Sequence, residues 1–149
     1  MPQLQVTIVE ARGLKQQDTF SANDGFVEVY LDKNYKQKTK TKKNSNKPQW
    51  NETFVFNHQT GQDTLFLDVY DQDLLTKDTI GKTTIDLKKI YDKGKEKNNK
   101  QSYIQTRTNI LGHLDAWIKL PHKTDHTSSN GELHVIIDYQ TFDKQYAYL

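Results

Sequence analysis

Apolar residues recur at every second position along much of this sequence, and this period of two constrains the fold more than any other feature. In the segment LQVTIV, Leu4, Val6 and Ile8 alternate with polar residues, and GELHVIIDY repeats the pattern at residues 131–139. Successive side chains of a β-strand point to opposite faces, so these segments are expected to be strands with one buried face. The dominant period is two rather than 3.6, which predicts an all-β protein.

Turn-forming residues separate about eight such segments. Gly, Asn, Ser and Pro cluster at 21–25, 44–48 and 128–131, between apolar runs. This spacing predicts an eight-stranded antiparallel β-sandwich, with a domain at 1–140 and a C-terminal tail at 141–149. A short helical turn is expected at 87–91. The expected strands are 4–9, 26–31, 36–43, 49–57, 64–70, 83–87, 116–120 and 131–139.

Composition narrows the function classes. The chain of 149 residues has no cysteine, which excludes disulfides, thiolate zinc sites and cysteine nucleophiles. A formal net charge of +2 is too small to indicate bulk nucleic-acid binding. The N-terminus lacks a signal-peptide pattern, and no apolar run approaches a membrane span. We therefore expect a cytoplasmic protein with at most peripheral membrane contact. No hydrolase or nucleotide-binding motif occurs, so we expect no enzyme activity.

Two acidic clusters stand at strand ends. Asp18 and Asp24 lie between the first two expected strands, and Asp71, Asp73 and Asp78 follow the fifth. A sandwich could bring both clusters to one edge, where five carboxylates would suit Ca²⁺, which takes six to eight oxygen ligands. Aspartate is also a common loop residue, so either cluster alone could be ordinary loop chemistry.

With their surroundings, the clusters resemble those of the C2 domain family. The resemblance rests on the motifs LQVTIVEARGL, SANDGFVEVYL, NKPQWNETFVF, LFLDVYDQD, KDTIGKTTIDL and GELHVIIDY in this order. It covers nearly the whole chain and implies a single stand-alone C2 module that binds phospholipid. Because the chain opens on LQVTIVEARGL, it resembles the permuted, type II topology of this fold.

The resemblance implies one or two Ca²⁺ ions, held by carboxylates and by two backbone carbonyls. Two departures from the family pattern matter. Gly25 stands where proline is usual, which is expected to loosen the first loop. The spacing from Asp73 to Asp78 is one residue short, which affects an outer ion more than an inner one. The implied carboxylate ligands are Asp18, Asp24, Asp71, Asp73 and Asp78, and the implied backbone ligands are Gln17 and Gln72.

Apolar and basic residues complete the expected membrane surface. Phe20, Leu74 and Leu75 lie at loop tips, where they could insert into a bilayer or fold back onto the rim of the sandwich. Four alternating lysines in KQKTKTKK are expected on one face of a strand, where they could bind phosphoinositides or simply protect a sheet edge. These anionic-lipid candidates are Lys36, Lys38, Lys40 and Lys42.

The sequence thus predicts a monomer that binds anionic phospholipid membranes when Ca²⁺ is present. The alternative, from another class, is a calcium-independent protein-interaction module that acts as an adaptor for a protein partner. Nucleic-acid binding through 36–43 is not expected, because only Tyr35 accompanies the lysines in the sequence.

Overall fold

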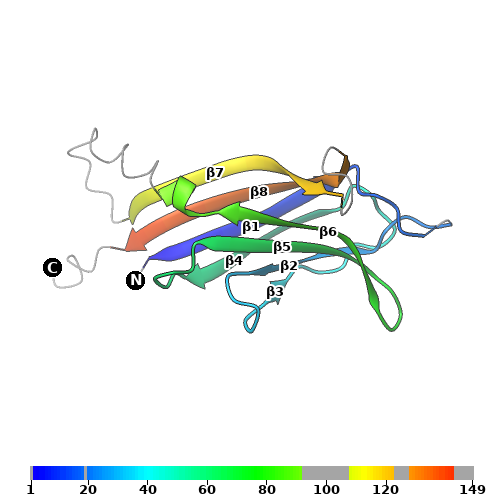
Figure 1. Ribbon diagram of the computed structural model, residues 1–149, viewed down its shortest axis with the longest axis horizontal. Helices are drawn as coiled ribbons and strands as arrows, with labels where there is room; N and C mark the ends of the chain where they lie inside the picture. Colours follow the sequence, from blue (N-terminus) through cyan, green and yellow to red (C-terminus); the bar gives the residue numbers. More distant parts are fainter. Residues whose placement is uncertain (1, 19, 92–107, 123–127, 143–149) are drawn as a thin grey trace.

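The computed structural model is a β-sandwich, and it describes residues 2–18, 20–91, 108–122 and 128–142. One antiparallel sheet, sheet A, has the strand order β4-β1-β8-β7, and the other, sheet B, has the order β3-β2-β5-β6 (Figure 1). The predicted eight-stranded antiparallel sandwich is therefore confirmed. The strands are β1 (Gln3–Arg12), β2 (Gly25–Tyr30), β3 (Gln37–Lys38), β4 (Gln49–Asn57), β5 (Thr64–Gln72), β6 (Lys77–Asp86), β7 (Thr108–Pro121) and β8 (Ser129–Phe142).

The core forms between the sheets from the alternating residues of the sequence. Leu4, Val6 and Ile8 of β1 are fully buried. Val27 and Val29 of β2 contribute to the same core from sheet B. Burying one such side chain contributes about 1.5–3 kcal/mol, so the matched alternation of both sheets drives their packing.

Strand β1 lies inside sheet A, paired with β4 on one side and β8 on the other. The first segment of the chain is therefore an interior strand. Assignment to the permuted, type II topology stays a prediction.

Several elements differ in length from the prediction. Strand β6 begins at Lys77 and strand β7 at Thr108, both earlier than the sequence pattern indicated. The helical turn at 87–91 is present, with the Tyr91 amide donating to the Leu87 carbonyl at 3.1 Å. Strand β8 runs to Phe142, and the domain limit at 140 stays a prediction. Residues 92–100 and most of the expected tail, 143–149, lie outside the described residues.

The predicted strand through 36–43 is wrong beyond Lys38. Strand β3 contains only Gln37 and Lys38, because the buried Thr39 uses its side chain in place of a regular ladder. Its Oγ1 accepts a hydrogen bond from the Val27 amide at 3.0 Å and donates to the Lys40 carbonyl at 3.0 Å. Lys40 and Lys42 are therefore not successive rungs of one strand.

The connections at one end of the sandwich carry the acidic residues. The β1–β2 loop and the β5–β6 turn extend from the same end, at the right of Figure 1, and the β4–β5 connection lies at the other end. No helix among the described residues is long and apolar enough to cross a bilayer.

Candidate functional site

The second acidic cluster lies on a tight hairpin. Strands β5 and β6 pair Asp71 with Asp78 and Gln72 with Lys77. The Asp73 amide donates to the Thr76 carbonyl at 2.9 Å and closes the turn. Asp71 and Asp78 are thus strand residues rather than loop residues, and the sheet holds them opposite each other.

The β1–β2 loop is bonded directly to this hairpin. The Asp24 amide donates to Asp71 Oδ1 at 2.7 Å, and the Gln72 amide donates to the Asp24 carbonyl at 2.8 Å. These two bonds bring the first acidic cluster against the second, as the sandwich fold predicted.

Three of the five predicted carboxylates converge. One oxygen each from Asp18, Asp71 and Asp73 lie within 4.8 Å of one another. Asp78 is close enough to Asp73 for the two carboxyl groups to share a hydrogen bond when one of them is protonated. The Asp24 carboxylate faces the β3–β4 connection, where its Oδ1 accepts from the Asn44 amide at 2.7 Å. We call the five aspartates the acidic cup.

The surroundings of the acidic cup raise the pKa values of two of its carboxyl groups, Asp71 and Asp73. Asp71 is only 2% exposed, and burial together with the nearby Asp18, Asp24 and Asp78 charges raises its pKa, against the bond from the Asp24 amide. The pKa of Asp73 is also raised, first by the hydrogen bond with Asp78 and then by partial desolvation and like charge. Without a cation, the cup is strained by its own charge.

One atom of the cup indicates what the site accepts. Asp71 Oδ2 is buried and has no hydrogen-bond partner. Buried polar atoms are nearly always satisfied, so an orphaned oxygen on a carboxylate that gathers with two others is consistent with a cation site. An all-oxygen donor set of carboxylates suits Ca²⁺, a hard cation.

Asparagines that no sequence motif predicted hold the loops of the cup. Asn23 is 1% exposed, and its side-chain amide donates to the Lys15 carbonyl at 3.0 Å and to Asn46 Oδ1 at 2.8 Å. Asn44 has a φ of 52°, a left-handed conformation that asparagine tolerates. The only sequence signal was the density of asparagine in the two turn segments 21–25 and 44–48.

Gly25 does not loosen the first loop, contrary to the prediction. Its amide donates to the Lys42 carbonyl at 3.1 Å, and its carbonyl accepts from the Lys42 amide at 2.9 Å and from Trp50 Nε1 at 3.2 Å. A proline here could not donate the first of these bonds. Both the amide and the carbonyl of Gly25 are hydrogen-bonded, so the first loop is anchored where it enters β2.

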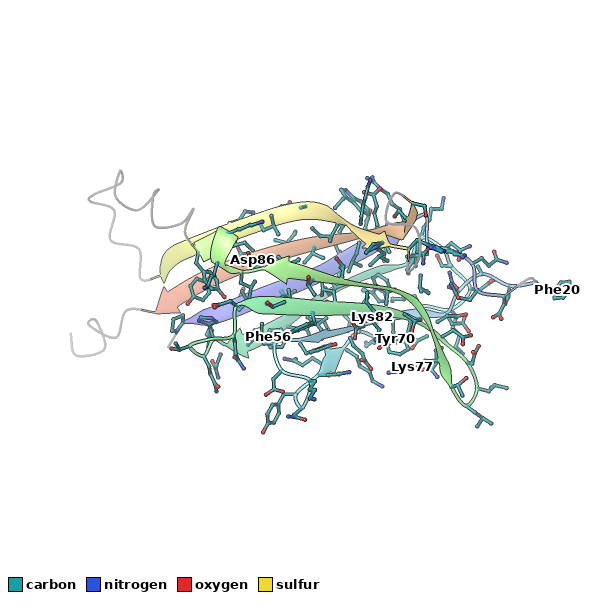
Figure 2. The ribbon with its side chains drawn as sticks, viewed as in Figure 1. Phe20, Phe56, Tyr70, Lys77, Lys82 and Asp86 are labelled. Carbon is teal, nitrogen blue, oxygen red and sulfur yellow. The ribbon has the colours of Figure 1, made fainter. Side chains whose placement is uncertain are left out.

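The three predicted insertion residues are fully exposed. The exposed fractions are 99% for Phe20, 102% for Leu74 and 96% for Leu75. Figure 2 shows Phe20 at the extreme tip of the molecule, at the end that carries the acidic cup. The alternative that these side chains fold back onto the rim is therefore wrong.

Lysines of sheet B lie over aromatic rings. Lys36 Nζ is 4.7 Å from the centre of the Tyr30 ring, and Lys38 Nζ is 5.8 Å from that of Phe26. Lys77 Nζ lies 4.1 Å from the Tyr70 ring centre. Lys36 and Lys38 thus lie over rings of one face of sheet B, as predicted, whereas strand β3 ends before Lys40 and Lys42.

Acidic residues on the same face neutralise part of this charge. Glu28 binds Lys77 at 2.7 Å and Lys36 at 3.3 Å. Burial opposes its ionisation, but the two lysines outweigh that effect and lower the pKa of Glu28. Tyr30 donates to Asp68 Oδ2 at 2.8 Å, and burial followed by this bond raises the pKa of Tyr30 to about 12.

The aromatic residues beneath the lysines could not be predicted from the lysine segment, because they come from β2 and β5. Phe26 and Tyr70 are nevertheless buried, with exposed fractions of 3% and 5%. Nucleic-acid binding by stacking requires open ring faces. The rings of Phe26 and Tyr70 are covered, so they offer no open face on which a base could stack.

A family model describes most of this architecture. The model for "C2 domain" matches residues 2–103, more than half of the chain. The chain belongs to the C2 domain family. A C2 domain of plant extended synaptotagmin 1 matches in structure with a TM-score of 0.72 and 25% identity, over 95% of this chain and 96% of that one. The family and fold predicted from the sequence are confirmed.

Curated relatives extend this result. Human synaptotagmin-7 is 38% identical over 94 residues, which are 58% of this chain and 23% of that protein. The 16 kDa phloem protein 2 of Arabidopsis thaliana is 26% identical over 86% of both chains. Mouse cytosolic phospholipase A2 delta is 45% identical over 80 residues, 52% of this chain and only 10% of the enzyme. This C2 domain therefore spans less than a quarter of synaptotagmin-7 and a tenth of the phospholipase.

Proposed function

We propose that this C2 domain binds anionic phospholipid membranes through its acidic cup when Ca²⁺ occupies it. The observation that carries the proposal is Asp71 Oδ2, a buried carboxylate oxygen without a hydrogen-bond partner, on a residue whose carboxylate gathers with those of Asp18 and Asp73. Membership of a Ca²⁺- and phospholipid-binding family supports it. Ca²⁺ supplies positive charge and open coordination positions that lipid phosphates can fill.

The proposed ligands are the five carboxylates of the cup. Asp18, Asp71 and Asp73 are already close enough to share one ion, and Asp78 and Asp24 adjoin them. The backbone carbonyls of Gln17 and Gln72 are proposed to complete the shells of one or two ions. Because hydrogen bonds already fix both loops, filling the cup changes charge more than shape.

The membrane contact is proposed to combine charge with apolar insertion. The empty cup repels an anionic surface, and the filled cup does not. Phe20, Leu74 and Leu75 flank it and are exposed enough to enter the bilayer. No catalytic group is assigned. The protein is proposed to be a cytoplasmic, monomeric, peripheral membrane binder and not an enzyme.

Co-sedimentation with phosphatidylserine vesicles tests this function. We expect the protein to sediment with vesicles in millimolar Ca²⁺ and to remain in solution with a chelator. Equal sedimentation in both conditions would assign binding to the lysines of sheet B instead. No sedimentation in either would favour the alternative, a calcium-independent protein-interaction module.

The lysine segment is proposed as a second contact, for phosphoinositides. Lys38 and Lys40 carry exposed charges without an acidic partner among the described residues, whereas Lys36 is paired with Glu28. Each lysine near an anionic leaflet contributes about 1 kcal/mol. Lys42 is half-buried at the bridge to Gly25 and is expected to contribute least.

The variant Lys38→Glu/Lys40→Glu tests this contact. We expect about a 30-fold or larger loss of affinity for phosphoinositide vesicles, because two attractive charges become repulsive. The loss should shrink at high salt. Lys119→Glu, an exposed lysine on sheet A, is the matched control. Equal losses in both variants, or none in either, would remove the lysine segment from the lipid site.

A further inference from the structure

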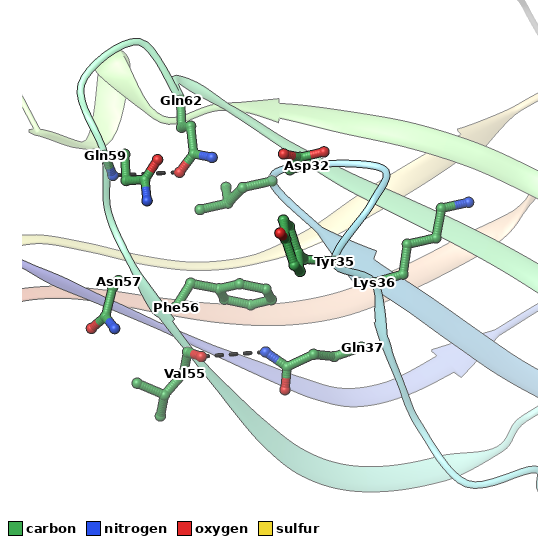
Figure 3. A pocket seen from close by; sticks show the side chains of 10 residues that line it. Asp32, Tyr35, Lys36, Gln37, Val55, Phe56, Asn57, Gln59 and Gln62 are labelled. Carbon is green, nitrogen blue, oxygen red and sulfur yellow. Dashed lines mark hydrogen bonds between the residues drawn. The ribbon is translucent and has the colours of Figure 1, made fainter.

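A groove opens on the side of the sandwich where the edge strands β3 and β4 face each other (Figure 3). It has a volume of about 520 Å³ and combines aromatic, aliphatic and amide side chains. In Figure 3 the Phe56 ring points toward Tyr35, and both residues line the groove. Figure 2 places Phe56 toward the end opposite Phe20, so the groove stays accessible when the loop tips meet a membrane.

Strand β4 borders this groove with an unpaired edge. Among the described strands, β4 pairs only with β1. The Thr7 and Thr53 hydroxyls meet at 2.8 Å, as in the narrow, non-hydrogen-bonded pairs of an antiparallel ladder. The peptide groups of Thr53, Val55 and Asn57 therefore point away from β1, along the free edge of β4, and Val55 and Asn57 line the groove.

A side chain already imitates a neighbouring strand on this edge. Gln37 Nε2 donates to the Val55 carbonyl at 3.3 Å, where the amide of an added strand would donate (Figure 3). The Asn57 and Gln59 side-chain amides also line the groove and make no hydrogen bond within the described part of the chain. Primary amides match the donor and acceptor of a peptide group. The site thus has the chemistry to bind extended backbone.

The surface of the groove leaves apolar area to be covered. Tyr35 is 77% exposed and Val55 is 47% exposed, and both line the groove above the largely buried Phe56. Aromatic residues in such positions are typical anchors of protein interfaces. One apolar side chain of a bound strand would cover these rings.

The charged residues beside the groove indicate which kind of partner it favours. The segment beside the groove exposes Lys33, Lys36, Lys38 and Lys40. Lys36 is paired with Glu28, whereas Lys33, Lys38 and Lys40 form no ion pair within the described residues. The acids Asp32 and Glu52 bond the backbone instead: Asp32 accepts from the Asn34 amide at 2.9 Å, and Glu52 accepts from the Lys40 amide at 2.9 Å. Pairing β4 with a second copy would bring two such basic rims together, which disfavours a dimer. An acidic partner is favoured instead.

We propose that this groove binds an extended acidic segment of a partner protein, which adds as a strand to the free edge of β4 and seats an apolar side chain against Tyr35 and Phe56. Strand addition obtains affinity from main-chain hydrogen bonds and specificity from alternate side chains. The interaction uses no residue of the acidic cup and needs no Ca²⁺. It gives the domain a protein-binding surface in addition to its proposed membrane surface.

The test uses a fluorescein-labelled heptapeptide that alternates glutamate with valine or phenylalanine, in the presence of chelator. We expect saturable binding by fluorescence anisotropy, with ¹⁵N amide shifts at Thr53, Val55 and Asn57. The variant Val55→Pro removes the backbone amide of Val55, which points away from β1 and makes no hydrogen bond to it. This change should weaken peptide binding about tenfold. Gln37→Ala frees the Val55 carbonyl and should tighten binding about two- to tenfold. A gain of affinity cannot arise from misfolding.

Separate readouts keep the two proposals distinct. In Ca²⁺, Val55→Pro and Gln37→Ala should sediment with phosphatidylserine vesicles to the same extent as the wild type, whatever that extent is. A version of the peptide with lysine in place of glutamate should bind at least about tenfold more weakly, because it meets like charge. Absence of saturable binding, equal binding of both peptides, or wild-type affinity of Gln37→Ala would each overturn the proposal.

Discussion

Replacing Asp71 by Asn is expected to stabilise the calcium-free protein and to abolish its response to calcium. Asp71 is buried with one orphaned oxygen and a raised pKa, so its charge destabilises the empty cup. Asparagine keeps a polar group at this position but removes the buried charge and its repulsion from Asp18, Asp24 and Asp78. Each kcal/mol gained in this way raises Tm by about 2–4 °C in a domain of this size, so we expect an increase of about 3 °C or more without Ca²⁺. The substituted side chain would be neutral and could still accept the hydrogen bond from the Asp24 amide.

The calcium response should change in the opposite direction. At about 100 times its Kd, a ligand that binds only the folded state stabilises by about 2.7 kcal/mol, so wild-type Tm should rise by about 5–10 °C. Asp71→Asn should lose this rise and the calcium-dependent vesicle binding. Differential scanning fluorimetry with Ca²⁺ and with chelator measures both effects.

The pH dependence gives this prediction a second readout. Because the folded-state pKa of Asp71 is raised, the unfolded chain releases this proton first as pH rises. Stability of the calcium-free protein should therefore fall from the ordinary aspartate pKa of 3.8 upward until the folded carboxyl has ionised. The part of this fall that comes from Asp71 should be absent in Asp71→Asn.

Asp68→Asn is the matched control for a buried aspartate. Asp68 is 3% exposed, but its Oδ2 is satisfied by the hydroxyls of Tyr30 at 2.8 Å and Tyr70 at 3.3 Å. This variant should gain no stability and should keep the full calcium response. A calcium response that survives in Asp71→Asn, or that disappears in both variants, would contradict the assignment of the cup.

The double variant Leu74→Ser/Leu75→Ser is expected to lower affinity for phosphatidylserine vesicles by about 100-fold or more. Each leucine is fully exposed at the hairpin tip, and burying one in a bilayer contributes about 1.5–3 kcal/mol. Since about 1.4 kcal/mol is a factor of ten, the pair accounts for two or more orders of magnitude. Vesicle titration in saturating Ca²⁺ measures the change.

Folding and calcium binding should be unaffected by this double change, because neither leucine packs against the sandwich. The control Val55→Ser removes an exposed apolar side chain on β4, outside the loop tips, and should bind vesicles like the wild type. Retained vesicle affinity in the leucine variant would mean that the cup binds lipid headgroups without insertion.

The sequence alone determined the type of fold and the residue types of the candidate site. The alternation of Leu4, Val6 and Ile8 depends only on the two-residue period of a strand, which no tertiary contact can alter. The acidic clusters and the apolar loop tips were equally visible, because polarity and turn chemistry are local properties. The family motifs then connected these residues to calcium and phospholipid.

Only the tertiary structure decided which of these groups meet, and in what state of burial. Asp71 and Asp73 are two residues apart, yet only Asp71 is buried without a partner, because β2 and the first loop cover it. Strand β3 ends at Lys38 because Thr39 and Glu52 bond the backbone with side chains, a substitution that alternation does not reveal. The groove beside β4 likewise depends on how the edges of two sheets are placed. Periodicity is a property of one strand, whereas burial, orphaned atoms and free edges arise from the packing of several.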